Sequence, residues 1–161
     1  MNRPANPEKT REQVLTARET KRHRAEELGV DCDYVDALVE RFYARIRDDQ
    51  LLSPIFAERI AEWAEHLERM KAFWRSVLFN SGEFSGNPMA KHLAIPGLEE
   101  RHFARWLTLF YATLRDLEGD PRATPLVAMR ARSIADSLLT GIAIRRDGLA
   151  GSRAGGNLPH V

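Results

Sequence analysis

The chain has 161 residues, of which 24 are lysine or arginine and 23 are aspartate or glutamate, so its formal net charge is +1. This length predicts one domain whose core needs no covalent staple, and near-neutrality argues against a nucleic-acid partner, which would require a basic stripe. The single cysteine, Cys32, excludes an intrachain disulfide and a cysteine-rich metal site. No apolar run reaches the length of a membrane span or resembles a signal sequence. We therefore expect a cytoplasmic protein without membrane or nucleic-acid partners.

The two ends of the chain differ in composition from the middle. Residues 1–30 are highly charged and carry only a thin apolar face of Val14, Leu15 and Leu28, which predicts an N-terminal extension that is helical at most. Residues 147–161 are rich in glycine and lack hydrophobic periodicity, which predicts a disordered tail. The folded domain is accordingly expected over residues 31–146.

Four stretches of this domain have the apolar spacing of amphipathic helices, and none has the alternation of a β-strand. The first follows Asp31 and Asp33, either of which can cap a helix. The others are expected near residues 59–78, 98–117 and 125–144. The long connection before the third holds one short helical turn, with Asn87 as its cap and Pro88 at its first position. The pattern predicts an all-α fold.

Two histidines occupy positions that suit a binding site. His66 lies between Trp63 and Met70 on the apolar face of the second helix, although a core histidine with one hydrogen bond explains that position equally simply. His92 lies on the short turn, whose rigid ends could fix the ring direction that a metal ligand needs. For His92 the plainer alternative is a partly exposed loop residue.

The chemistry of these histidines favours a haem over a zinc site. Zinc needs three or four protein ligands, and neither a cysteine nor a carboxylate at metal spacing accompanies the pair. A haem needs one strong axial ligand, an apolar slot and donors over its open face. Tyr43, His66 and Trp106 supply O–H or N–H donors from three helices. Covalent haem attachment is excluded, because no Cys-x-x-Cys-His motif is present.

Five segments together resemble the group III truncated haemoglobins: FYARIRDD, LLSPIF, EWAEHLERMKAFW, GNPMAKHLAIP and HFARWLTLFYATL. The resemblance runs from about Asp31 to Ile144 and depends on these segments occurring in the family's order. It implies a truncated globin fold, in which the helices form a two-over-two sandwich around a non-covalently bound haem b. Residues 1–30 have no counterpart in it.

The resemblance also implies roles for individual residues. The proximal iron ligand falls on His92, and the distal polar residues fall on Tyr43, His66 and Trp106. The remaining expected haem contacts are the edge residue Phe56, the apolar residues Met70, Phe73 and Trp74, and the propionate partners Arg69 and Lys91.

The family's chemistry implies an open axial position on the iron that binds O₂, NO and CO. Three donors near a bound O₂ would slow its release, because each charge-assisted hydrogen bond is worth ~1.5–3 kcal/mol. One alternative is a redox enzyme, which carries out NO dioxygenation or reduces peroxide or nitrite and depends on an external electron donor. Another is a haem-free helical interaction module, in which alanine at His66 and His92 would be tolerated.

Overall fold

The computed structural model describes residues 7–161, and its regular elements are all helices, with no β-strand in that range. It confirms the expected all-α fold. No helix of the described chain is long and apolar enough to cross a bilayer. The elements are α1 (Pro7–Glu27), α2 (Cys32–Asp48), α3 (Ser53–Arg59), α4 (Trp63–Phe79), α5 (Pro88–Leu93), α6 (Glu100–Asp116), α7 (Ala123–Asp147) and two 3₁₀ turns, η1 (Gly148–Gly151) and η2 (Ala154–Asn157).

Helix α2 begins where the sequence predicts, because Asp31 caps it. The Asp31 carboxylate accepts a hydrogen bond of 2.8 Å from the backbone N–H of Tyr34, which satisfies one of the free donors of the first turn. The apolar stripe that follows is buried along its whole length. Phe42, near the middle of that stripe, is 1% exposed, so α2 forms one wall of the core.

The second predicted helix is shorter than expected at its start, because α3 is a separate helix and α4 begins only at Trp63. Ile60 and Glu62 have extended backbones, with φ −110° and −117°, so the helix is interrupted between α3 and α4. The spacing of apolar residues continues across this interruption and therefore does not reveal it. Before α3, the buried carboxylate of Asp49 accepts hydrogen bonds from the backbone N–H of Leu52 and the guanidinium of Arg105. This bond to α6 fixes the chain between α2 and α3.

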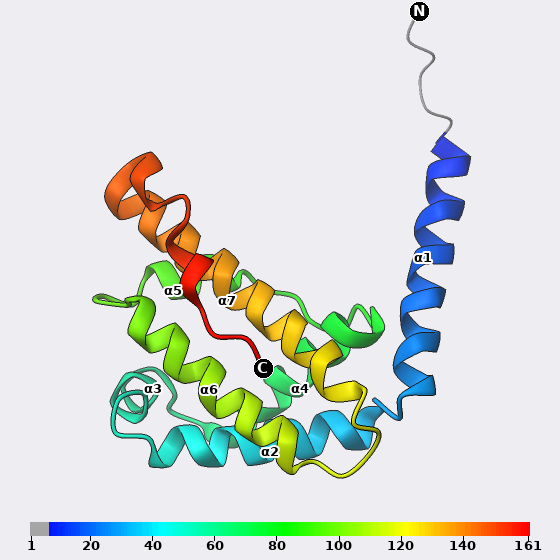
Figure 1. The fold of residues 1–161 in the computed structure, drawn as a ribbon, viewed down its shortest axis with the longest axis horizontal. Coiled ribbons are helices and arrows are strands. Elements are labelled where there is room, and N and C mark those ends of the chain that lie inside the picture. The colour runs from blue at the N-terminus through cyan, green and yellow to red at the C-terminus, as the bar shows by residue number, and fades with distance from the viewer. Residues whose placement is uncertain (1–6) are drawn as a thin grey trace, which may run out of the picture.

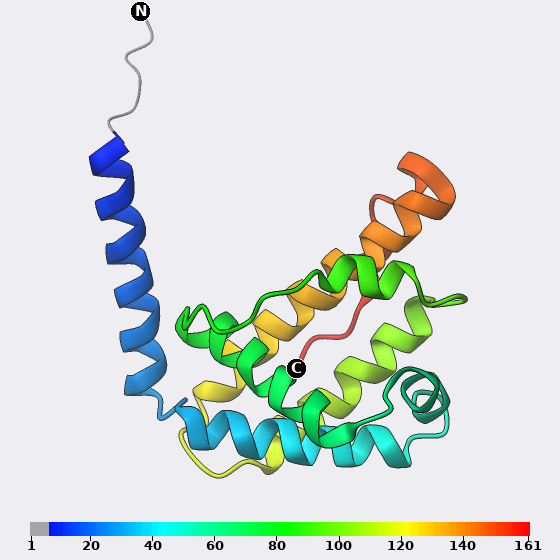
Figure 2. The ribbon, with the colours of Figure 1, turned by 180° about the vertical axis from the view of Figure 1, so that it is seen from behind.

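The four long helices of the domain form two layers. Helix α2 packs against α4 and α6, and α6 packs along α7, as Figures 1 and 2 show from opposite sides. Phe42, Leu107 and Phe110 meet in the middle of the core and are each no more than 1% exposed. The short helix α5 contacts α7, where Gly141 leaves room for the Met89 side chain.

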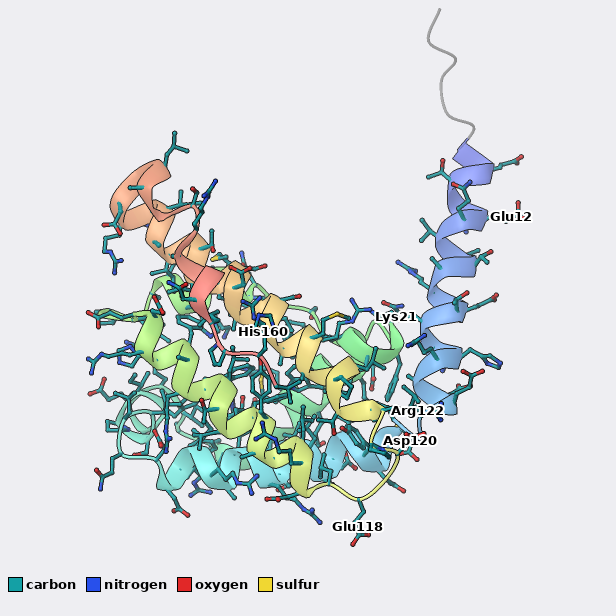
Figure 3. The ribbon with its side chains drawn as sticks, viewed as in Figure 1. Glu12, Lys21, Glu118, Asp120, Arg122 and His160 are labelled. Carbon is teal, nitrogen blue, oxygen red and sulfur yellow. The ribbon has the colours of Figure 1, made fainter. Side chains whose placement is uncertain are left out.

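Helix α1 contacts α4 near one end, and the rest of it extends away from the other helices (Figures 1 and 2). Its C-terminal end is anchored by the buried residue Ala25, and by Leu28 and Val30 directly after the helix. Lys21 points from α1 toward the body of the protein, with Nζ 3.5 Å from Oδ1 of Asn80 (Figure 3). A groove of about 910 Å³ separates α1 from the ends of α4 and α7. Residues 1–6 of the expected extension lie outside the described chain.

The end of the chain differs from the disordered tail that the sequence predicts. It turns back through η1 and η2, and the last residues run between α6 and α7 (Figure 1). Leu158 is 2% exposed, and the Tyr111 hydroxyl donates a 2.7 Å hydrogen bond to the carbonyl of Pro159. Gly151 and Gly155 are buried, and a Cβ at Gly155 would collide with the Asp136 carboxylate. The glycines therefore allow close packing in this segment, although their frequency in the sequence predicted flexibility.

Candidate functional site

The short helix α5 holds His92 in a defined orientation. Asn87 caps the helix by accepting a 3.0 Å hydrogen bond from the backbone N–H of Ala90. One turn later, Nδ1 of His92 lies 2.6 Å from the carbonyl oxygen of Pro88. A carbonyl only accepts, so Nδ1 carries the proton and the lone pair of the neutral ring is on Nε2. A half-buried histidine with this tautomer is prepared to bind a metal ion through Nε2.

His66 of α4 lies against Tyr43 of α2. Their ring centroids are 5.1 Å apart at 88°, and the Trp63 ring contacts His66 at 5.8 Å and 89°. Nε2 of His66 is buried and has no hydrogen-bond partner. A buried polar atom without a partner costs stability, so its presence beside Tyr43 points to a ligand that completes the hydrogen bond.

Burial sets the protonation of both residues. It lowers the pKa of His66, and the nearby charges of Arg69 and Lys91 lower it further. Burial also raises the pKa of the Tyr43 hydroxyl well above its ordinary value. At neutral pH the site therefore presents a neutral imidazole and a protonated phenol, both of which can donate a hydrogen bond without introducing a charge.

The third expected donor, Trp106 of α6, contacts Phe42, whose ring also contacts Tyr43. The Trp106 ring is stacked on Phe110 at 5.2 Å and lies edge-on to Phe42 at 5.3 Å. It is only half-buried, unlike the core residue Phe110. Trp74, expected as an apolar contact of the site, is 2% exposed and packs on Phe110 at 5.0 Å. It therefore belongs to the core beneath the site.

The other expected site residues are distributed around the same elements. Phe56 of α3 and the α4 residues Met70 and Phe73 are half-buried against the core. Arg69 and Lys91 are exposed on α4 and α5, and both are close enough to influence the pKa of His66. Arg69 also lies 3.7 Å from Glu65, one turn earlier on the same helix.

These residues fit a flat apolar cofactor with one axial ligand. His92 offers a free Nε2, and α3, α4 and α6 carry half-buried apolar side chains that could line a haem slot. The unpartnered Nε2 of His66 supplies a polar atom for a ligand on the far face. Within the described chain, no group of three or more histidine, cysteine, aspartate or glutamate side chains could hold a bare metal ion.

Sequence reasoning missed one contact of this site. It placed Trp63 only in the apolar stripe of the second helix and gave Arg47 no role. In the structure the Arg47 guanidinium lies 4.7 Å above the Trp63 ring. The available signal was spacing, because Arg47 is one helical turn after Tyr43 and Trp63 is one turn before His66.

Comparisons with known proteins agree with this arrangement. A family model for the bacterial-like globins matches residues 25–133. The chain is 32% identical over 110 residues to the Group 3 truncated hemoglobin ctb of Campylobacter jejuni, which covers 66% of this chain and 86% of that protein. Its fold is similar to the crystal structure of group III truncated hemoglobin from Campylobacter jejuni, with a TM-score of 0.64 and 30% identity over 67% of this chain and 87% of that one. All the candidate site residues lie inside the family match.

Proposed function

We propose, from the premise that this chain belongs to the bacterial-like globin family and within it to the group III truncated haemoglobins, that it holds haem b non-covalently through His92 and binds O₂, NO and CO. Family membership makes it a haem-binding globin. Haem b, its non-covalent attachment, the role of His92, the identity of the gas ligand, the slow release of O₂ and the cytoplasmic location are all parts of the proposal.

The proximal side of the site is organised by α5. When bound, haem would supply an iron atom that can bind a diatomic ligand. His92 would hold that iron through Nε2, and the Pro88 carbonyl keeps the required lone pair on this atom. Arg69 and Lys91 are exposed on α4 and α5, where they can pair with the haem propionates.

The distal side is proposed to donate hydrogen bonds to the bound gas. Tyr43, His66 and Trp106 approach from three helices, and burial keeps the first two in their uncharged donor forms. A charge-assisted hydrogen bond is worth ~1.5–3 kcal/mol. One such bond slows O₂ release by about 10–100-fold, since ~1.4 kcal/mol corresponds to a factor of ten.

One observation carries this proposal: the buried Nε2 of His66 lacks any hydrogen-bond partner beside Tyr43. A core histidine, the plainer alternative, would normally be satisfied. The redox enzyme stays an alternative, and it requires an external electron donor. The hydrogen-bond partner of His92 is a neutral carbonyl, which makes the imidazole a weaker electron donor than a carboxylate partner would. This favours binding of a gas over redox catalysis.

The proposal is tested by the visible spectrum of His92→Gly, with His23→Gly as the matched control. His23 is exposed on α1, far along the chain from the site. We expect His92→Gly to lose its normal haem spectrum and to regain it when imidazole is added, while the control keeps the wild-type spectrum. A normally ligated haem in His92→Gly would overturn the proximal assignment. Failure of the wild-type chain to take up haem would favour the interaction module.

The O₂ dissociation rate then separates the two haem functions. Slow release of O₂ from a stable ferrous O₂ form would support a site in which several donors bond to the gas. Release as fast as that of a storage globin would contradict the polar distal site. Rapid turnover of NO or peroxide with a supplied reductant would favour the redox alternative.

A further inference from the structure

The Trp63 ring is enclosed by three neighbours that do not belong to the core. Trp63 is stacked on Phe56 at 6.4 Å and 26°, and it meets His66 edge-on at 5.8 Å. The Arg47 guanidinium covers its face at 4.7 Å. In the described chain Arg47 makes no ion pair within 4.0 Å, so the Trp63 ring is its principal contact.

The position of Trp63 on α4 determines what it does to His66. Side chains of a helix lean toward its N-terminus and lie over the residue one turn earlier. The His66 ring therefore leans toward Trp63, which is three residues earlier. Tyr43 bounds the same ring at 5.1 Å and 88°. With both neighbours in place, Nε2 is sealed from solvent.

We propose that Trp63, capped by Arg47, is a positioning residue that holds the His66 ring against Tyr43 and so controls ligand access to the site. The role of the pair in ligand access rests on the function proposed above. The orientation of His66 does not, because it follows from contacts within the protein alone. Because Arg47 covers the Trp63 ring and Trp63 contacts His66, loss of the Arg47 contact should loosen both rings.

The contact between Arg47 and Trp63 is of a kind that forms and breaks often. Arg47 is exposed, and a guanidinium stacks flat on an indole in a way that a lysine ammonium does not. An exposed contact of this kind is weak, so its loss should accelerate opening by about two- to fivefold. Trp63 supports both the cap and the His66 contact, and its loss should accelerate opening by about tenfold.

The test uses the full chain and four variants: Arg47→Lys, Trp63→Leu, Trp63→Phe and the control Arg115→Gln. Arg115 is exposed on α6 and makes no contact with the site residues. Two quantities are measured: the rate of CO recombination after photolysis of the ferrous CO form, and the His66 pKa by NMR titration. Arg47→Lys keeps the charge, so any change reports the lost stacking.

We expect CO recombination to be about tenfold faster in Trp63→Leu, about two- to fivefold faster in Arg47→Lys, and unchanged in Arg115→Gln. The His66 pKa should rise toward its ordinary value in Trp63→Leu, because the freed ring becomes hydrated. Trp63→Phe should fall between Trp63→Leu and the wild type. A folded Trp63→Leu with wild-type recombination and a wild-type His66 pKa would overturn the proposal.

Two further outcomes are separable. If Trp63→Leu does not fold, Arg47→Lys and Trp63→Phe decide the question, and wild-type values in both overturn the proposal. If the chain takes up no haem, the proposed function fails, while the NMR titration still tests whether Trp63 holds His66. An increased His66 pKa in haem-free Trp63→Leu would support the positioning role.

Discussion

The replacement of Leu158 by alanine tests whether the end of the chain is part of the folded protein. Leu158 is 2% exposed, and its carbonyl accepts hydrogen bonds from the Arg132 guanidinium on α7. Truncation of a buried leucine costs about 2–5 kcal/mol. A segment near a chain end relaxes more easily than a central helix, so we expect about 2–3 kcal/mol, at the low end of that range. For a chain of this size the loss lowers Tm by about 4–12 °C.

The assay is thermal unfolding followed by circular dichroism, with Leu149→Ala as the control. Leu149 lies in the same tail but is 87% exposed, so its truncation should leave Tm within about 2 °C of the wild type, as for other surface substitutions. Equal Tm values for Leu158→Ala, Leu149→Ala and the wild type would refute the packing described for the tail. Equal values would instead support the disordered tail that the sequence predicts.

Three further predictions concern the site and its support. Asp49→Ala should lower the free energy of unfolding by about 1.5–3 kcal/mol in chemical denaturation, because it removes the acceptor for Arg105 and the backbone N–H of Leu52; an unchanged midpoint would argue against that bond. The lowered pKa of His66 means that the unfolded chain binds its proton first, so stability should fall as pH decreases below about 6.5, and the slope should be smaller in His66→Gln. Tyr43→Phe should accelerate O₂ dissociation by about 10–100-fold in stopped flow; an unchanged rate would remove Tyr43 as a donor.

The parts of the fold that the sequence predicted depend on neighbouring residues. Helix α2 was predictable because its cap, Asp31, and its apolar stripe lie in one continuous segment. The break between α3 and α4 was not, since the extended backbone at Ile60 and Glu62 interrupts the helix without interrupting the apolar spacing. The tail was misjudged for a related reason: one apolar anchor, Leu158, and hydrogen bonds from Tyr111 and Arg132 replace the periodicity of a helix.

The residues of the candidate site also divide into those that a local sequence pattern reveals and those that only the fold brings together. The setting of His92 was recognisable from Asn87 and Pro88, which belong to the same short helix. The role of each distal residue came from resemblance to a family, and the structure adds the contact between Tyr43 and His66. The Arg47 contact with Trp63 required α2 and α4 to be packed together, which no local pattern reveals.

The arrangement of α1 has a consequence for how the chain behaves toward proteases. The described side chains from residue 10 to residue 20 are exposed, so this stretch can unfold locally without opening the core. Cleavage should therefore trim α1 and stop near Ala25, the first buried residue, which is also where the globin match begins. The trimmed product would keep every residue proposed to bind haem, so we expect it to take up haem as the full chain does.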